Sequence, residues 1–267
     1  MDLFSGIGGI SLALAPWSRT IAYCESDRYA QSVLLSRMAD GLLDNAPIWD
    51  DIRSLKRSHL PPIDLVFGGF PCQDISTAGR GEGLEGKRSG LFFEVIRLVD
   101  ELRPSFVFLE NVAAIVTRGL GTVLGEFTEL GYDCRWTIVS ASELGAPHQR
   151  RRWFLLAHTD RDIGGNKWET VERENAEMGH QSTIDAKFNG DQGYVADAYC
   201  EGLERQRRRE SQFDRSAKGR WWKSEPAVGR VVNGLPHRVD RIRCLGNSVV
   251  PMQAREAFER LSGMKSL

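Results

Sequence analysis

The sequence predicts an α/β fold, in which short buried strands alternate with helices to form an open sheet. Apolar runs such as residues 63–67 and 106–109 have the length of buried strands and are bounded by proline, glycine or charged residues. Between them, apolar residues recur at helical spacing over residues 91–102, before Pro104. Sheets of this kind bind their ligands at the carboxyl ends of the strands.

A glycine-rich turn follows the first expected strand, which comprises residues 1–4. Gly6, Gly8 and Gly9 form the turn, and the helix after it runs through Leu14. Glycines at this place allow a nucleotide-like ligand to lie against the backbone at the start of a helix. Many glycine turns bind nothing, so this turn alone does not establish a ligand.

Acidic residues end the next two expected strands. Residues 20–24 predict a strand that ends at Glu25, where an acid commonly binds ribose hydroxyls. Residues 48–49 predict a third strand, after which Asp50 and Asp51 offer carboxylates to an adenine amino group. Either Asp is equally suited to cap a helix. Three consecutive strand ends with suitable groups predict an adenosine-type cofactor.

A cysteine follows the fourth expected strand, residues 63–67. Pro71 fixes the backbone before Cys72, and we expect Gly68 and Gly69 to let the chain turn sharply and a ligand approach closely. A thiol held on a rigid turn suggests a nucleophile. A small buried cysteine that fills core space is the alternative.

The remaining elements continue the α/β pattern. The glycine- and charge-rich residues 76–90 predict a long loop beside Cys72, and we expect it to act as a lid. The strand at residues 106–109 ends in Glu110, which places a second acid on the same sheet edge as Cys72. Further expected elements are a helix at residues 120–130, strands at residues 132–139 and 153–157, and a closing amphipathic helix that carries Ala254, Ala257, Phe258 and Leu261.

Basic residues gather in two places, although the formal net charge of the chain is −1. Three arginines, residues 150–152, precede the last expected strand and suit recognition of carboxylate, phosphate or base edges. Residues 203–243 hold twelve Lys or Arg against five acidic residues. Such a segment suggests a surface that binds a polyanion, with a solvated charged face as the alternative. Periodicity is lost from residue 158 to about residue 230, which predicts a small irregular insert.

The composition argues against several classes of protein. Hydrophobic and charged fractions of 41% and 27% are typical of soluble globular proteins. We find no signal-peptide pattern and no apolar run long enough to span a bilayer, so we expect a cytoplasmic protein without membrane contact. The five cysteines form no CxxC pair, so we expect neither a disulfide framework nor a metal site.

In their order along the chain, these motifs resemble the cytosine-C5 DNA methyltransferase family over nearly the whole length. The stretches that carry the resemblance are Phe4-Ser5-Gly6-Ile7-Gly8-Gly9 (first cofactor motif), Pro71-Cys72-Gln73 (catalytic motif), Glu110-Asn111-Val112 (target-base motif) and Gly246-Asn247-Ser248-Val249-Val250-Pro251 (last motif). The arginine motif departs from the family pattern, because alignment on Pro147 puts His148 in the place of the family's Gln. Arg150 and Arg152 keep the arginine positions.

The resemblance implies a fold, a reaction and a set of site residues. The expected fold is Rossmann-like and S-adenosylmethionine-dependent, with a small irregular target-recognition domain. The expected enzyme is a DNA (cytosine-5-)-methyltransferase that transfers a methyl group from S-adenosyl-L-methionine to C5 of a flipped-out cytosine in a specific double-stranded DNA sequence. The implied catalytic residues are Cys72, Glu110, Arg150 and Arg152, and the implied cofactor-binding residues are Phe4, Gly6, Gly8, Gly9, Glu25, Asp51, Ile52, Pro71, Leu91, Asn247 and Ser248.

The resemblance also implies a domain organisation and partners. Residues 1–157 are expected to form the catalytic and cofactor-binding domain, residues 158–232 the target-recognition region, and residues 233–267 a return to the catalytic domain. We expect a monomer that binds double-stranded DNA in the bacterial cytoplasm or nucleoid, with a cognate restriction endonuclease as a further partner to consider. Two alternatives stay open: a tRNA cytosine-C5 methyltransferase, and a catalytically idle nucleic-acid-binding relative.

Overall fold

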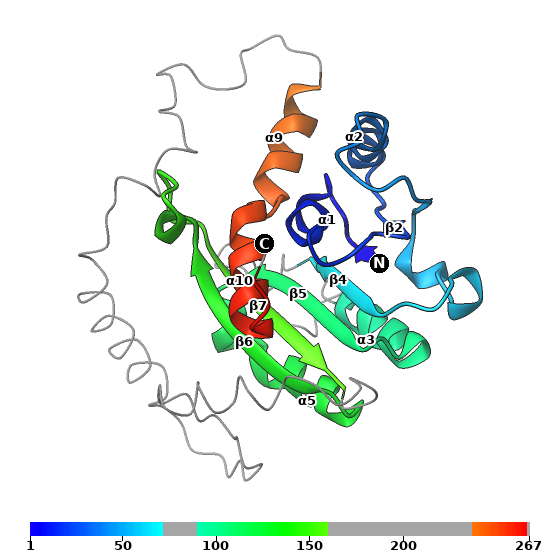
Figure 1. The fold of residues 1–267 in the computed structure, drawn as a ribbon, viewed down its shortest axis with the longest axis vertical. Helices are drawn as coiled ribbons and strands as arrows, with labels where there is room; N and C mark the ends of the chain where they lie inside the picture. Colours follow the sequence, from blue (N-terminus) through cyan, green and yellow to red (C-terminus); the bar gives the residue numbers. More distant parts are fainter. Residues whose placement is uncertain (72–89, 160–236, 266–267) are drawn as a thin grey trace. The chain divides into compact units, whose positions relative to one another are not determined.

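The computed structural model describes residues 1–71, 90–159 and 237–265. Cys72, the loop expected after it and nearly all of the expected target-recognition region lie outside the described residues. The described strands form one sheet in the order β3-β2-β1-β4-β5-β7-β6 (Figure 1). These strands are β1 (Asp2–Leu3), β2 (Tyr23–Cys24), β3 (Ile48–Trp49), β4 (Leu65–Gly69), β5 (Phe106–Val112), β6 (Asp133–Ser140) and β7 (Arg151–His158).

The sheet is mostly parallel. β1 pairs in parallel with β2 and β4, while β3 extends the sheet beyond β2 and β5 extends it beyond β4. β7 runs antiparallel to both β5 and β6. The strand order changes direction between β1 and β4, and such a switch point is where open α/β sheets bind ligands. The α/β fold predicted from the sequence is therefore confirmed.

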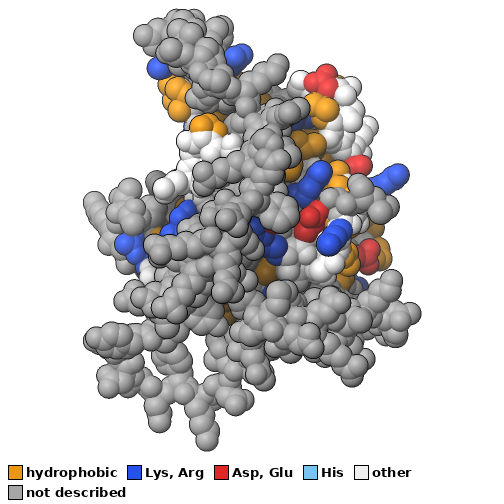
Figure 2. Space-filling view, turned by 60° about the vertical axis from the view of Figure 1, so that its left-hand side comes forward, with side chains coloured by type: hydrophobic (Ala, Val, Ile, Leu, Met, Phe, Trp, Pro, Cys, Tyr) orange, Lys and Arg blue, Asp and Glu red, His pale blue; other side chains and the backbone are white. Residues whose placement is uncertain are grey.

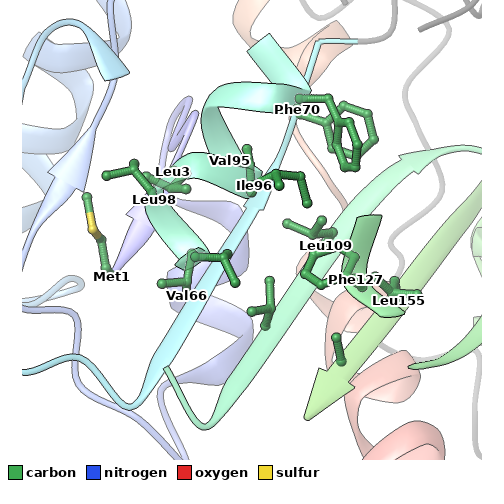
Figure 3. Packing of buried hydrophobic residues seen from close by; sticks show 14 of the residues in the cluster. Met1, Leu3, Val66, Phe70, Val95, Ile96, Leu98, Leu109, Phe127 and Leu155 are labelled. Atoms are coloured by element: carbon green, nitrogen blue, oxygen red, sulfur yellow. The ribbon is translucent and has the colours of Figure 1, made fainter. Parts of the chain in front are cut away.

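Helices cover both faces of the sheet because its side chains alternate between them. Val66 and Leu109 lie on one face in a cluster with Val95 and Ile96 (Figure 3). On the other face, the Phe108 ring lies 5.4 Å from the Phe258 ring. The described α-helices are α1 (Gly9–Leu14), α2 (Arg28–Ala39), α3 (Leu91–Leu102), α4 (Ile115–Arg118), α5 (Leu120–Glu129), α9 (Arg238–Asn247) and α10 (Pro251–Ser262). In the part of the chain that the structure describes, no helix is long and apolar enough to cross a membrane.

Local signals set several helix boundaries, one of which the sequence predicted. α3 spans Leu91–Leu102, as its apolar spacing predicted. α2 begins where Oδ1 of Asp27 accepts a hydrogen bond of 2.9 Å from the backbone N–H of Ala30. α10 begins at Pro251 and ends before Gly263, whose φ of 73° suits a glycine at a helix end.

The structure corrects the turn expected at Gly68 and Gly69. Both residues belong to β4, which continues through them instead of turning. The reason lies on the neighbouring strands: a Cβ atom at Gly68 would lie 2.1 Å from the carbonyl oxygen of Leu3, and one at Gly69 would lie 2.7 Å from Oε2 of Glu110. The two glycines thus permit close packing within the sheet.

Four other strands differ in length from their predictions, and one of them is β1, which spans only Asp2–Leu3 instead of residues 1–4. β2 is shorter than residues 20–24, because the N–H of Thr20 donates to Asp44 and its hydroxyl lies 3.0 Å from that of Ser11, outside the strand ladder. β5 and β7 are longer, because Val112 pairs with Arg152 and so carries both strands past Glu110. The target-base motif Glu110–Val112 and Arg152 of the arginine motif therefore lie within the sheet, whereas Arg150 precedes β7.

Candidate active site

The glycine turn after β1 is held by an acid from the end of β2. Oε2 of Glu25 accepts a hydrogen bond of 2.7 Å from the N–H of Gly6, and Oε1 accepts one of 2.8 Å from Asp27. Phe4 has a φ of 52°, in the left-handed region that residues with side chains seldom adopt. Backbone strain of this kind is characteristic of functional turns. The structure thus brings together Phe4, Gly6 and Glu25.

Gly8 and Gly9 serve close packing around the start of α1. A Cβ atom at Gly8 would lie 2.5 Å from Cδ1 of Leu43, and the φ of 80° at Gly8 also favours glycine. A Cβ atom at Gly9 would lie 3.0 Å from Cγ1 of Val249. Since Val249 belongs to the last motif, the two ends of the described chain meet at this glycine.

The end of β3 shows the capping arrangement that the sequence left open. Oδ1 of Asp51 accepts a hydrogen bond of 3.0 Å from the N–H of Arg53, at the start of a 3₁₀ turn over Ile52–Ser54. This backbone hydrogen bond, aided by the Arg53 side chain, holds the pKa of Asp51 below its usual value. Ile52 is buried in the core beside β1. The side chain of Asp51 is 45% exposed, and its Oδ1 lies 3.1 Å from Nε of Arg53.

An ion pair joins β5 and β7 at the carboxyl end of β4. Glu110 stands opposite Gly69 in the β4–β5 register and opposite Phe154 in the β5–β7 register. Nε of Arg152 lies 2.8 Å from Oε1 of Glu110. The exposed fractions of the two side chains are 18% for Arg152 and 12% for Glu110. Burial raises the pKa of Glu110 more than the charges of Arg152 and Arg150 lower it. Glu110 therefore holds a proton at a higher pH than an ordinary glutamate.

A hydrogen bond and ring packing anchor Phe70, the residue at which the chain leaves β4. Nδ2 of Asn111 donates a hydrogen bond of 3.3 Å to the carbonyl of Phe70, whose ring is buried 5.1 Å from the ring of Phe92 (Figure 3). Pro71 follows Phe70 and is the last described residue before Cys72. Leu91, the first residue of α3, packs against the same core. Sequence reasoning gave Asn111 no role of its own, although its place beside Glu110 was a signal.

Arg150 holds the last motif in place. Its Nη2 donates to the carbonyls of Gly246, at 2.8 Å, and of Ser248. The backbone of Arg150 is itself held, because Nε2 of the fully buried Gln253 donates to its carbonyl at 2.6 Å and to that of Val139 at 2.9 Å. Gln253 carried no recognisable signal in the sequence. The guanidinium of Arg150 is thus bound to backbone carbonyls, whereas that of Arg152 pairs with the acid.

Asn247 and Ser248 end α9. Asn247 is the last residue of the helix, and the hydroxyl of Ser248 donates to the carbonyl of Leu245 at 3.1 Å. α9 is tied to the start of α2 by Arg243, whose Nη2 lies 2.6 Å from Oδ2 of Asp27. Asp27 lies two residues after Glu25, and its N–H donates a hydrogen bond to the Glu25 carboxylate. Through Asp27, α9 is therefore linked to the acid that holds the glycine turn.

Little of the basic segment at residues 203–243 lies within the described residues. Its described cations are Arg238, Arg241 and Arg243, and the last of these pairs with Asp27 and Asp240. On the face drawn in Figure 2, Lys and Arg side chains lie in several small groups with acidic and hydrophobic side chains between them. A polyanion-binding surface stays a prediction. Among the described residues, no three His, Cys, Asp or Glu side chains are grouped to hold a metal ion.

Comparison with known proteins identifies the family. The C-5 cytosine-specific DNA methylase family profile matches residues 1–225. The chain is 40% identical over 159 residues to the Type II methyltransferase M.CviJI of Paramecium bursaria Chlorella virus IL3A. The aligned region covers 59% of this chain and 42% of that protein. It is 39% identical over 166 residues to the Type II methyltransferase M2.BsuMI of Bacillus subtilis, and this alignment covers 59% of this chain and 41% of that protein. The chain thus spans about half the length, or less, of these curated relatives.

A solved structure supports the fold. The Entamoeba histolytica methyltransferase EhMeth superposes with a TM-score of 0.52 at 17% identity, over 62% of this chain and 53% of that one. The sheet with its switch point between β1 and β4 is therefore the Rossmann-like fold of methyltransferases. Since the family profile covers most of the sequence, the chain belongs to the C-5 cytosine-specific DNA methylase family.

Proposed function

We propose that this chain is a DNA (cytosine-5-)-methyltransferase that transfers a methyl group from S-adenosyl-L-methionine to C5 of a flipped-out cytosine in a specific double-stranded DNA sequence. The partly buried pair of Glu110 and Arg152 carries this proposal. It presents an acid with a raised pKa and a cation at the carboxyl end of β4, immediately before the Pro71–Cys72 segment. Such a pair suits a ring that must gain negative charge at a nitrogen and an oxygen.

The residues that follow β1, β2 and β3 are suited to bind S-adenosylmethionine. Glu25 is placed to accept hydrogen bonds, and its present partners are the backbone N–H groups of Gly6 and Asp27. Asp51 keeps an exposed carboxylate that can accept from an adenine amino group. We assign cofactor binding to Phe4, Gly6, Glu25, Asp51 and Ile52, with Gly8, Gly9, Pro71, Leu91, Asn247 and Ser248 completing the site. When bound, S-adenosylmethionine supplies an electrophilic methyl group, which C5 of the cytosine accepts.

The proposed chemistry begins with Cys72. Its thiolate adds to C6 of the cytosine, and the electrons of the C5–C6 double bond move into the ring, which makes C5 nucleophilic. After C5 is methylated, C5 loses its proton and the thiolate leaves C6, so that the aromatic ring and the free enzyme are restored. C6 is inaccessible in a stacked base pair, so the cytosine must leave the helix.

Glu110 and Arg152 stabilise the ring during this addition. Glu110 would share or donate a proton at N3, where negative charge develops, and the raised pKa of Glu110 favours this role. The guanidinium of Arg152 has further N–H groups besides the Nε that faces Glu110, and these can donate to the base carbonyl oxygen. Arg150 holds the segment of Gly246 and Ser248 through its guanidinium, and its charge also acts on Glu110.

The proposal extends to organisation and partners. Residues 158–232 would recognise the target sequence, between a catalytic domain of residues 1–157 and its return at residues 233–267. The protein would act on double-stranded DNA as a monomer in the cytoplasm. The relatives are named Type II methyltransferases, so a cognate restriction endonuclease is a partner to search for. The alternatives are a tRNA cytosine-C5 methyltransferase and an idle nucleic-acid-binding protein.

The test combines labelled methyl transfer with covalent trapping. The protein is incubated with labelled S-adenosylmethionine and either plasmid DNA or total tRNA, and Cys72→Ala is assayed beside it. We expect label in DNA alone and none with Cys72→Ala. DNA that contains 5-fluorocytosine should form a covalent adduct only with the unmodified chain. Label in tRNA would favour the first alternative, no label in either would favour the second, and an adduct with Cys72→Ala would remove Cys72 from its role.

A further inference from the structure

Two adjacent glycines end β4, and they meet different neighbours. Side chains of successive strand residues point to opposite faces of a sheet, so Gly68 and Gly69 face opposite ways. A Cβ atom at Gly68 would lie 2.1 Å from the backbone carbonyl oxygen of Leu3, on the neighbouring strand β1. A Cβ atom at Gly69 would instead lie 2.7 Å from Oε2 of Glu110. Gly68 therefore makes room for a strand, whereas Gly69 makes room for a carboxylate.

The contact at Gly69 concerns one particular oxygen. Glu110 has its Oε1 at 2.8 Å from Nε of Arg152, and its other oxygen lies over Gly69. One oxygen of the carboxyl group therefore faces the cation on β7, and the other faces bare backbone on β4. The next nearest atoms to a Cβ at Gly69 also belong to Glu110, at 3.8 and 3.9 Å.

We propose that Gly69 is a positioning residue, which sets where the carboxyl group of Glu110 lies and so keeps it paired with Arg152. The inference rests on the proposed function, since it concerns the acid of the same site. Gly69 touches neither substrate nor cofactor in this role. It acts only by lacking a side chain beneath Oε2 of Glu110.

The effect of replacing each glycine by alanine depends on whether the atom that the new Cβ meets can move away. The end of a glutamate side chain can rotate away from an added methyl group, so Gly69→Ala should fold and displace the carboxyl group. A backbone carbonyl in a sheet cannot rotate away, so Gly68→Ala should separate β1 from β4 and destabilise the protein. Gly125 of α5 has no atom within 4 Å of an added Cβ, and Gly125→Ala is the tolerated control.

The experiment measures single-turnover methyl transfer in a double-mutant cycle. Gly69→Ala should lower the rate of transfer by about tenfold or more, leave the dissociation constant for S-adenosylmethionine unchanged, and shift the pH profile of the rate. In a Glu110→Ala background, the same glycine substitution should change the rate by less than about twofold, because no carboxyl group remains to be displaced. Gly125→Ala should match the unmodified protein in every measurement.

A crystal structure of Gly69→Ala gives a readout that does not depend on turnover. We expect Oε1 of Glu110 to have left Nε of Arg152 while the β4–β5 pairing is retained. A misfolded Gly69→Ala protein, an unmoved Glu110, or an equally large loss of rate in the Glu110→Ala background would each overturn the inference. If the unmodified chain transferred no methyl group while the displacement was seen, the proposed function would fail and the positioning of Glu110 by Gly69 would stand.

Discussion

Arg152 and Glu110 face each other across β7 and β5, with Nε and Oε1 2.8 Å apart and most of both side chains shielded from solvent. Two opposite effects act on the acid: burial raises the pKa of Glu110, and the positive charge of Arg152 lowers it. The balance of these effects decides when Glu110 can donate a proton.

Arg152→Met should raise the pKa of Glu110 further, because the burial remains and the nearest opposing charge is lost. A carbon-13 NMR titration of the labelled glutamate carboxyl groups would measure this pKa, with Glu110→Gln to assign the signal. The exposed neighbour Arg151 provides the control, since Arg151→Met should leave that titration unchanged. A lower pKa for Glu110 in Arg152→Met would contradict the balance described above.

Glu110→Gln should slow methyl transfer by about 10²-fold or more, since loss of a positioned general acid typically costs that much. Cofactor affinity should stay close to that of the unmodified protein, because Glu110 stands on β5, whereas the acids assigned to the cofactor, Glu25 and Asp51, follow β2 and β3. Calorimetric titration with S-adenosylmethionine, beside the transfer assay, separates the two effects. An equal loss of both would indicate a structural role for Glu110.

Arg150→Met should weaken cofactor binding, because it frees the carbonyls of Gly246 and Ser248 beside the glycine turn. We expect the dissociation constant for S-adenosylmethionine to rise by roughly tenfold, which corresponds to the loss of about 1.4 kcal/mol. Arg151→Met is again the matched control on the next residue. Unchanged cofactor affinity with a large loss of transfer rate would show that Arg150 acts on the base instead.

Much of the fold followed from the sequence because its signals are local. The apolar spacing that predicts α3 and the closing amphipathic helix α10 depends on residues close in the chain, and both helices are present. The roles of Gly68 and Gly69 depend on Leu3 and Glu110, which are distant in sequence. Only the strand register shows those neighbours, so a turn was predicted where a strand continues.

The candidate site likewise combines residues that the sequence predicted with contacts that only the structure shows. The sequence identified Glu25 and Gly6 separately, and the structure adds the hydrogen bond between them. Gln253 could not be predicted, because a single glutamine in an amphipathic helix has no pattern that shows it will be buried against Arg150. Cys72 lies outside the described residues, so its role depends on the motif and on the anchoring of Phe70 before it.

The contribution of Asp2 to the stability of the protein should fall as the pH rises towards 7. Burial raises the pKa of this carboxyl from 3.8 to about 7, while Ser11 donates to it at 2.6 Å. The folded state therefore holds a proton that the unfolded state releases above pH 3.8, and this contribution to stability is lost as the pH rises through that interval. The slope from one such group is at most about 1.4 kcal/mol per pH unit.

Asp2→Asn should remove that slope, since the amide oxygen still accepts from Ser11 and carries no charge. Urea unfolding at several pH values between 4 and 7 would compare Asp2→Asn with the unmodified chain and with Asp133→Asn, an exposed control. A pH dependence that survives in Asp2→Asn would assign it to another group.

Exchange of residues 158–232 for the corresponding segment of a relative with a different target should change the methylated sequence and preserve methyl transfer. The expectation follows from the proposed role of this segment in recognition. Bisulfite sequencing of host DNA after expression would report activity and target together. The same methylated sequence before and after the exchange would place recognition elsewhere in the chain.

The position of β1 between β2 and β4 has a consequence for how mutations combine. Glu25 follows β2 and Glu110 belongs to β5; two strands lie between β2 and β5, and three strand spacings amount to roughly 14 Å. At such a separation, free-energy changes from independent sites usually add. The effects of substitutions that change cofactor affinity and of substitutions that change the pKa of Glu110 should therefore add when they are combined. The two properties can thus evolve separately within one sheet.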